Sequence, residues 1–541
     1  MMKRIFYRIY YCVTFFMCLQ GTAVAQKGSR PNIVLIVGDD IGFSDIGCYG
    51  SEIETPNLDK IANNGVRFGQ FYNMAKCNPT RSSIFTGLYS GDDRAISFAH
   101  LLREAGYYNI HSGKEHFDNW VPERCFAVNN FDHTFTFFAS TQYFIPPDSI
   151  FKYPYYLDGK RLSSRDLDKI ETPFYQTNAI TDLALKWLDE VPKDSPFFLY
   201  LPYHSAHFPL QALPQDILKY RDIYRQGWDK IRDSRFKKQN KLGIIPENSK
   251  LSEPMPNPRG FNPSGSNEDE MRQLMSIYTP WKDLSEKQQN DFSLEMAVFG
   301  AMVDRMDQNV GRLLKKLKEM DVEKNTLIIF FSDNGSCPFD VNRDLKIPPG
   351  GADSYRSLST PWANLGNTPY KYYKQNGNEG GSHNHFIASW PDVITPHQFT
   401  MQPIHVVDIF PTILDIIKVQ YPSIIEGERT IPLDGSSFLS VLKGEPREEP
   451  DFFISGFTEA NRMYRRGDWK IVRVKNQPWE LYNLYVDPTE TNDLAQKMPE
   501  KLKSMIISYQ EKKTRLDGKL KAKINPVYYP YKGDDKSLNA Y

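Results

Sequence analysis

Four short apolar runs along the chain each end abruptly in polar residues. The runs are Asn32–Val37, Tyr107–Ile110, Phe197–Tyr203 and Thr326–Phe331. Because a run without apolar–polar alternation suits a strand that is buried on both faces, these segments predict a parallel sheet. Between Met296 and Leu317, apolar residues recur at spacings of three and four, which predicts an amphipathic helix.

Strands that alternate with helices indicate an α/β fold with crossover helices. We therefore predict a large mixed, mainly parallel sheet that is flanked by helices, over residues 26–447. From Glu448 the chain changes to short strand-like pieces and a charged helix near Leu494–Lys513, which predicts a smaller α+β domain over residues 448–541. Residues 133–175, rich in aromatics and proline, and residues 229–290 are expected to be insertions that form surface loops or pocket walls.

The N-terminus has the pattern of a secretory signal. Basic residues within the first eight positions precede the apolar run Ile9–Leu19, and the small residues Ala23-Val24-Ala25 follow it. We predict that residues 1–25 are removed and that the mature chain is exported, to the periplasm or the medium, with no membrane span.

Composition limits the classes of partner and of scaffold. Basic and acidic residues number 66 each, so no overall charge favours nucleic acid or a membrane surface. The cysteines that remain after removal of the signal are too few for a disulfide scaffold in so long a chain, and at most one bridge is expected.

Polar clusters follow the predicted strands, where an open sheet of this type binds ligands. Asp39-Asp40 follows the first strand and Asp333-Asn334 follows the last of the four. Each pair alone is typical of a helix cap or a turn. Together they offer oxygen ligands only, which favours a hard divalent cation and suits calcium somewhat better than magnesium.

The segment Cys77-Asn78-Pro79-Thr80-Arg81 places a thiol at a predicted helix start, because Pro79 suits the first helical turn. Arg81 then lies beside unpaired backbone N–H groups and the positive end of the helix dipole. A nucleophile at this position could attack an anionic ester while the helix end and Arg81 stabilise the charge. The alternative is a buried structural cysteine at an ordinary helix start.

Further candidate residues follow the other strands. Lys114 and His116 lie at the end of the second strand, where a lysine can hold an anionic oxygen and a histidine can act as acid or base. His207 follows the third strand, and Lys374 precedes Glu379-Gly380-Gly381. Taken singly, such residues are more often structural or solvated.

Together these motifs resemble the type I sulfatases of the alkaline phosphatase superfamily. The stretch from Cys77 to Gly87 is similar to the family signature, in which the cysteine is oxidised to formylglycine. The resemblance spans nearly the whole mature chain and implies an alkaline phosphatase-like fold. Other stretches that agree are Val303–Gly311, Asp408–Thr412, Gly467–Val472 and Trp479–Leu494.

The resemblance also implies the site and the reaction. The calcium ligands would be Asp39, Asp40, Asp333 and Asn334, and the catalytic residues would be Cys77, Arg81, Lys114, His116, His207 and Lys374. A hydrated formylglycine would attack sulfur, with His207 and Lys374 at the leaving alcohol oxygen and His116 as the base that releases sulfate. The implied partners are a sulfated carbohydrate and a formylglycine-generating or sulfatase-maturating enzyme.

Three residues at two places in the chain depart from the family pattern. Glu115 stands where the family often has tryptophan, and we expect its carboxylate either at the rim of the site or facing outward. His383 and His385 stand where the family has small apolar residues and proline, and we expect them either to contact substrate or to face solvent.

Two alternatives to a sulfatase remain open. The same cations would serve a phosphonate or phosphodiester hydrolase, and an unmodified Cys77 would be compatible with a non-catalytic glycan-binding protein.

Overall fold

The computed structural model describes residues 30–89, 95–116, 126–137, 142–145, 154–256, 274–425, 428–454, 461–474 and 477–520. The predicted signal, Cys125 and part of the aromatic segment 133–175 lie outside these ranges. Within them, no helix is both long enough and apolar enough to cross a membrane. Cys48, Cys77 and Cys337, the described cysteines, are free thiols.

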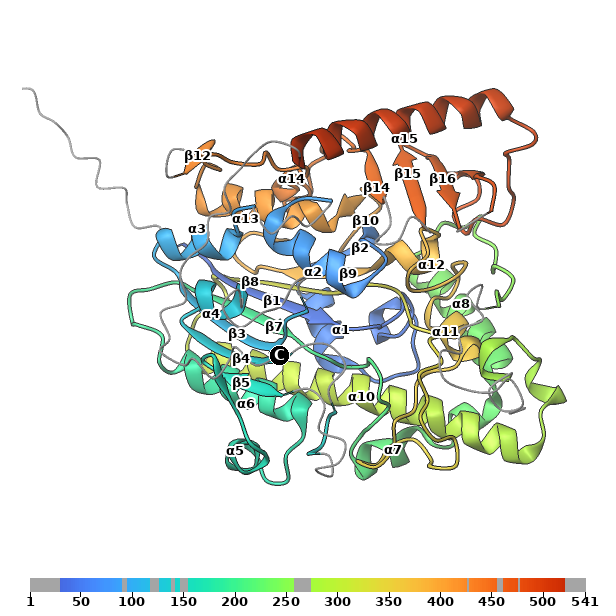
Figure 1. The fold of residues 1–541 in the computed structure, drawn as a ribbon, viewed down its shortest axis with the longest axis horizontal. Coiled ribbons are helices and arrows are strands. Elements are labelled where there is room, and N and C mark those ends of the chain that lie inside the picture. The colour runs from blue at the N-terminus through green and yellow to red at the C-terminus, as the bar shows by residue number, and fades with distance from the viewer. Residues whose placement is uncertain are drawn as a thin grey trace, which may run out of the picture.

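A large, mostly parallel sheet runs through the centre of the molecule (Figure 1). Its hydrogen-bonded order is β10-β2-β9-β8-β1-β7-β3-β4-β5-β6, with β11 paired to β2. The strands are β1 (Asn32–Gly38), β2 (Val66–Tyr72), β3 (Tyr108–Lys114), β4 (His133–Phe137), β5 (Tyr155–Leu157), β6 (Lys160–Arg161), β7 (Phe197–Pro202), β8 (Thr326–Ser332), β9 (His383–Ser389), β10 (Gln398–Thr400) and β11 (Ile404–His405).

The four apolar runs form the middle of this sheet. They give β1, β3, β7 and β8, and the parallel pairing of β1 with both β7 and β8 confirms the predicted parallel sheet. Along β1, Val34 and Ile36 face one core, whereas Ile33, Leu35 and Val37 face the other, so both faces of the strand are buried. This double burial is why the run has no polar alternation.

Helices cover both faces of the sheet (Figure 1). On one face lie α1 (Pro56–Asn63), α5 (Ser164–Ile170), α6 (Gln176–Leu188), α7 (Pro214–Tyr220), α8 (Trp228–Leu242), α10 (Glu286–Glu319) and α11 (Thr360–Gly366). On the other lie α2 (Cys77–Thr86), α3 (Phe98–Glu104), α4 (Phe126–Asn130), α13 (Ile409–Ile417) and α14 (Leu439–Leu442). The helix α15 (Pro499–Leu520) shares this core but packs against a smaller sheet near the C-terminal end of the chain (Figure 1). The apolar stripe from Met296 to Leu317 is the buried side of α10, as predicted.

A small antiparallel sheet follows near the C-terminal end of the chain, in the order β14-β15-β16-β17. Its strands are β14 (Phe452–Ile454), β15 (Arg462–Arg466), β16 (Trp469–Arg473) and β17 (Glu480–Asn483). Tyr464, Ile471 and Leu481 of this sheet share one continuous core with the second face of the large sheet. The segments before and after the predicted boundary at residue 448 therefore pack against each other. The division into two domains at this residue stays a prediction.

A buried ionic network also joins the two sheets. Lys470 of β16 pairs with Glu379 at 2.6 Å and with Glu490 at 2.9 Å. Glu379 is the first residue of α12 (Glu379–Ser382) and accepts a hydrogen bond from the Tyr72 hydroxyl at 2.9 Å. The backbone N–H of Glu379 donates to Glu490 at 2.9 Å. The small sheet thus fixes the segment that follows Lys374.

Candidate functional site

The candidate residues meet beyond the carboxyl ends of four adjacent strands, in the order β8, β1, β7 and β3. The register sets Gly38 beside Ser332, so Asp39 and Asp333 begin neighbouring loops. The N–H of Asp333 donates to the Gly38 carbonyl at 3.1 Å, and the N–H of Asp39 donates to the Ser205 carbonyl at 2.9 Å. The sheet therefore brings together residues that are hundreds of positions apart in the sequence.

The four candidate metal ligands share one feature: each has a buried side-chain oxygen with no hydrogen-bond donor among the described residues. These atoms are Oδ1 of Asp39, Oδ2 of Asp40, Oδ1 of Asp333 and Oδ1 of Asn334. A buried oxygen without a donor is costly, and four oxygens from carboxylates and an amide are the ligands of a hard cation. The residues thus fit a divalent cation such as calcium.

The second oxygen of each carboxylate is already paired. Asp39 Oδ2 forms a short ion pair with Lys114, and Asp333 Oδ2 accepts from Arg81 Nε at 2.8 Å. Asp40 Oδ1 accepts from Lys374 Nζ at 2.5 Å and from the Asn334 amide at 2.7 Å. These contacts leave the donor-free oxygens as the groups available to a cation.

The pKa values of the carboxylates reflect this crowding. Burial would raise the pKa of Asp39, but the charges of Lys114, His207 and Arg81 outweigh it and hold that pKa well below its usual range. Burial and repulsion from Asp39 raise the pKa of Asp333 well above its ordinary value, although Arg81 opposes them. A bound cation would relieve this repulsion.

Cys77 lies at the start of α2, 2% exposed, with its backbone at the positive end of the helix. One ligand atom each from Cys77, Asp39 and Asp333 lie within 4.8 Å of one another. Arg81, one turn later, is fully buried, and its pKa is raised because Asp333 and Asp39 outweigh the effect of burial. The thiol therefore faces charged groups, and this argues against the purely structural interpretation of the cysteine.

Lys114 and His116 lie at the end of β3, which runs on through the polar residues after Ile110. Arg81 Nη1 donates to the Lys114 carbonyl at 3.2 Å, and this contact links β3 to α2. His116 has a φ of 56°, a left-handed conformation that is uncommon outside glycine and is often found at functional sites. Burial, Lys114 and Arg81 lower the pKa of His116 well below its usual value, which keeps the imidazole neutral.

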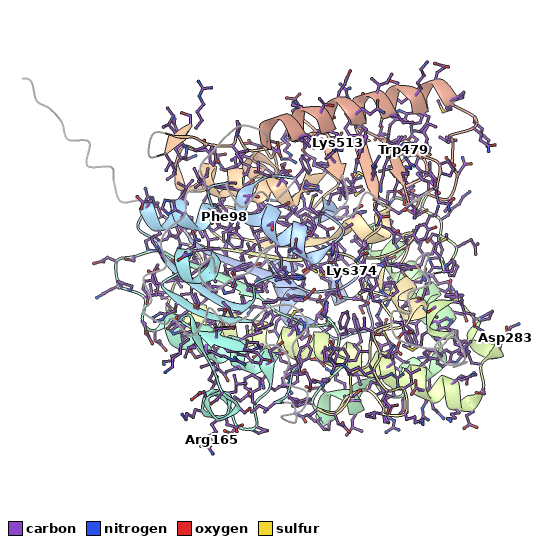
Figure 2. The ribbon with its side chains drawn as sticks, viewed as in Figure 1. Phe98, Arg165, Asp283, Lys374, Trp479 and Lys513 are labelled. Atoms are coloured by element: carbon purple, nitrogen blue, oxygen red, sulfur yellow. The ribbon has the colours of Figure 1, made fainter. Side chains whose placement is uncertain are left out.

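His207 and Lys374 both lie next to the Asp40 carboxylate. His207 Nε2 is 3.7 Å from Asp40 Oδ2, and its Nδ1 is 2.8 Å from the Phe208 carbonyl. Burial and Lys114 lower the pKa of His207. Burial would lower the pKa of Lys374, but Asp40 raises it well above its ordinary value, so the ammonium keeps its charge. Figure 2 shows Lys374 in the interior, between the two sheets.

Part of the aromatic segment 133–175 packs against the loop that carries His204 and His207. Phe137, Tyr143 and Tyr155 are buried, so these residues pack over the domain and cannot stack on a sugar. The Tyr143 hydroxyl donates to the carbonyls of His204 and His207, at 2.6 Å and 3.0 Å. The segment therefore holds the loop that follows β7.

Two expectations for the departures from the family pattern are wrong. Glu115 is neither at the rim nor outward: it is fully buried and accepts from the Ala127 N–H at 3.2 Å. His383 and His385 contact neither solvent nor an open site. His383 lies between Glu379, at 2.8 Å, and the Gly69 carbonyl, at 2.7 Å. His385 stacks on a buried ring, and burial lowers its pKa to about 3.

Sequence reasoning missed two residues of the site. His204 lies with Asp39 and His207, one ligand atom of each within 4.8 Å of the others. Cys337 is buried, and burial and the negative charge of Asp40 raise the pKa of its thiol. The only signal in the sequence was their position within a few residues of a strand end.

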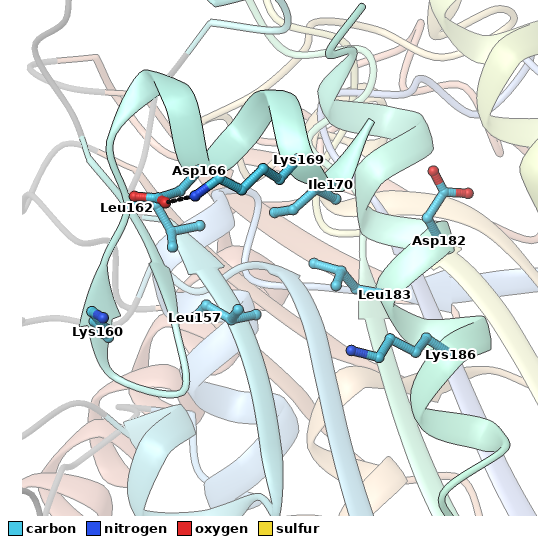
Figure 3. A pocket seen from close by; sticks show the side chains of 9 residues that line it. All are labelled: Leu157, Lys160, Leu162, Asp166, Lys169, Ile170, Asp182, Leu183 and Lys186. Atoms are coloured by element: carbon cyan, nitrogen blue, oxygen red, sulfur yellow. Dashed lines mark hydrogen bonds and ion pairs between the residues drawn. The ribbon is translucent and has the colours of Figure 1, made fainter. Parts of the chain in front are cut away.

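A surface pocket lies elsewhere, at the β5–β6 edge of the sheet (Figure 3). Apolar side chains such as Leu157 and Leu183 line it, together with Lys160 and Lys186. None of the candidate site residues lines it, so it is not the chemical centre of the molecule.

Comparison with known proteins identifies the class. The fold is that of sulfatases and alkaline phosphatase-like enzymes: the crystal structure of Ps i-CgsB in complex with k-i-k-neocarrahexaose aligns with a TM-score of 0.62 at 23% identity, over 89% of this chain and 92% of that one. Arylsulfatase of Klebsiella aerogenes is 28% identical, over 80% of this chain and 96% of its own length. N-acetylgalactosamine-6-O-sulfatase of Bacteroides thetaiotaomicron is 23% identical, over 91% and 94%.

The family profile described as Sulfatase matches residues 31–419. The chain therefore belongs to the sulfatase family and is a sulfuric ester hydrolase.

Proposed function

We propose that the protein is exported and hydrolyses a sulfate ester of a carbohydrate, with Cys77 converted to formylglycine and calcium as its metal. The observation that carries this proposal is the grouping of Cys77 with Asp39 and Asp333, beside oxygens that lack donors. The sulfated carbohydrate is proposed because relatives such as the N-acetylgalactosamine-6-O-sulfatase are named for sugar sulfates.

Asp39, Asp40, Asp333 and Asn334 would hold the calcium ion, which when bound supplies positive charge to the oxygens of the sulfate group. Lys114, Arg81 and Lys374 add cations around the same position, and α2 adds its N-terminal dipole. Buried cations of this kind stabilise the charge that develops on a transferring sulfuryl group more strongly than they would in water.

In the proposed reaction, one hydroxyl of the hydrated aldehyde at residue 77 would give its proton to a neighbouring carboxylate, Asp39 or Asp333, as its oxygen bonds to sulfur. The bond between sulfur and the ester oxygen would break in the same step. Lys374 and His207 lie together around Asp40, where a proton donor can serve the departing alcohol. His116, neutral because its pKa is lowered, takes the proton of the second hydroxyl. The carbon–oxygen bond to sulfate then breaks, which releases sulfate and restores the aldehyde.

The proposal includes a formylglycine-generating or sulfatase-maturating enzyme as partner, since an unmodified cysteine lacks the second hydroxyl. Export would bring the enzyme to glycans outside the cytoplasm. The division into a catalytic domain, residues 26–447, and a C-terminal subdomain, residues 448–541, is retained as part of the proposal.

Two measurements test the proposed function. Mass analysis of the peptide that carries residue 77, from protein made in its native host, should show the aldehyde; a fully unmodified thiol would favour a non-catalytic glycan-binding protein. A panel of defined sulfated monosaccharides and disaccharides should identify the substrate by sulfate release. Faster turnover of phosphate or phosphonate esters in parallel assays would favour the phosphoester alternative.

A further inference from the structure

One wall of the site carries an aromatic and cationic surface for which the reaction as proposed has no use. The Phe208 ring lies 3.9 Å from the imidazole of His207, measured between centroids. The Tyr355 ring lies 6.3 Å from that of Phe208, and the Arg343 guanidinium lies over Tyr355 at 3.9 Å. Phe208 and Tyr355 are half-buried, whereas Arg343 is exposed. Three successive contacts therefore lead from His207 to an exposed cation.

The wall is anchored to the body of the molecule. The N–H of Arg343 donates to the Tyr355 carbonyl at 3.2 Å, so the two stacked residues are also joined through the backbone. The next residue, Arg356, accepts at its carbonyl from the Leu210 N–H at 2.8 Å. Its buried guanidinium pairs with Asp291 of α10 at 2.6 Å. These contacts connect the wall to the loop of His207 on one side and to a long helix on the other.

The wall lies on the side of the site where the alcohol leaves. In the proposed reaction, His207 and Lys374 serve the alcohol oxygen. Lys374 Nζ lies 5.7 Å from the centre of the Phe339 ring, and Phe339 and Arg343 belong to the same segment. Lys374 is thus flanked by this segment and His207 by Phe208, so a substrate that both groups contact would lie beside this surface.

The N–H groups of the Arg343 guanidinium are available to a ligand. Across the described residues it has no carboxylate partner, and its charge is held only by the face of Tyr355. A guanidinium stacked on an aromatic ring is oriented in advance, and its planar N–H groups match a carboxylate or a sulfate in a two-pronged contact. Tyr355 and Phe208 offer ring faces against which a sugar can stack.

We propose that Phe208, Tyr355 and Arg343 form a subsite for a second anionic group on the substrate, a carboxylate or a second sulfate borne by the leaving sugar or its neighbour. The substrate class is therefore an acidic glycan with at least two negative charges. This inference rests on the proposed function, because it assumes that the alcohol leaves on the side of His207 and Lys374.

The test compares wild-type enzyme with Arg343→Ala, Arg343→Lys and Tyr355→Ala. Lys346→Ala, at an exposed position of the same loop, is the matched control. The probes are 4-methylumbelliferyl sulfate, N-acetylgalactosamine 6-sulfate and its 4,6-disulfate, and a chondroitin 6-sulfate disaccharide with its carboxyl-reduced form. The disulfate and the disaccharide separate a sulfate-binding subsite from a carboxylate-binding one.

Arg343→Ala should lower kcat/KM about tenfold or more on a probe with two anionic groups and less than about twofold on 4-methylumbelliferyl sulfate, since a charged hydrogen bond is lost. Arg343→Lys should recover part of the loss. Added salt should weaken wild-type activity on the two-anion probe more than that of Arg343→Ala.

Equal losses on all probes, or a wild-type enzyme that shows no preference for the second anion, would overturn the subsite while leaving the sulfatase intact. Absence of sulfate release from every probe by modified wild-type enzyme would instead count against the proposed function.

Discussion

Replacement of Lys470 by methionine tests the buried network that joins the two sheets. Lys470 is fully buried and is the shared cation of Glu379 and Glu490. The variant keeps most of the apolar stem but leaves two buried carboxylates without their cation. Removing one partner of a buried ion pair costs about 3–5 kcal/mol, because the remaining charge stays desolvated. We expect a fall in Tm of roughly 5 °C or more at pH 8.

The pH dependence gives the sharper result. In the wild-type protein, Lys470 and His383 outweigh burial and hold the pKa of Glu379 well below its ordinary value. The ionised Glu379 therefore stabilises the fold at every pH above the ordinary pKa of a glutamate. This stabilisation is lost only as the pH falls through the lowered pKa. The pKa of Glu490 is already raised by burial in the wild-type protein, although Lys470 opposes this effect. Without Lys470, burial and repulsion between the carboxylates raise the pKa of Glu379 and raise that of Glu490 further. The unfolded chain then releases protons that the native variant retains, so the variant loses stability as the pH rises.

The assay is thermal unfolding between pH 5 and pH 8. The gap in Tm between wild type and Lys470→Met should widen with pH, and Glu490→Gln in the same background should narrow it. Lys503→Met, at an exposed position of α15, is the control for loss of a lysine. The reasoning would be refuted if Lys470→Met lowered Tm no more than Lys503→Met does. It would also be refuted if the difference in Tm between Lys470→Met and wild type stayed constant from pH 5 to pH 8.

Three further predictions concern the site and its surroundings. Cys77→Ala should abolish sulfate ester turnover while Tm stays within about 2 °C of wild type; substantial residual activity would mean that the nucleophile is another residue. A calcium chelator should lower both activity and Tm, and added calcium should restore them better than magnesium, whereas an unchanged Tm would contradict the assignment of the four oxygen ligands. Burial raises the pKa of Glu295 from its ordinary value of 4.5 to about 7, against the opposing charge of Arg356. As the pH rises from 4.5 to 7, wild type should lose stability relative to Glu295→Gln, because the native state retains a proton that the unfolded chain releases. A difference in Tm between the two proteins that stays constant over this range would contradict the prediction.

The middle of the fold could be predicted from the sequence because local pattern decides it. The run Thr326–Phe331 is apolar at every position since both faces of β8 are buried, and a loop can begin only where the run ends. The lengths of the runs also place Asp39 and Asp333 next to each other at the carboxyl edge of the sheet. The parallel strands β1 and β8 begin side by side and have the same length, so they also end side by side.

The surroundings of Glu115, His383 and His385 could not be predicted in this way. A charged or ionisable side chain is buried where other groups compensate the loss of water, and here these groups come from other elements of the fold. They are the Ala127 N–H for Glu115, the Gly69 carbonyl for His383 and the Phe330 ring for His385. Lys470 is a similar case, since nothing near it in the sequence indicates that Glu379 neutralises it. Contacts between remote segments decide such positions, and one sequence does not record them.

The burial of Cys77 determines whether the proposed modification of this residue precedes or follows folding. The residue is 2% exposed, and the groups next to its thiol come from positions as distant as Asp39 and Asp333. A second enzyme that must bind the chain around residue 77 cannot do so once α2 has packed into the folded domain, because nearly every residue of this helix is then buried. Any conversion of Cys77 must therefore occur on a nascent or unfolded chain, and the speed of folding sets how long that opportunity lasts.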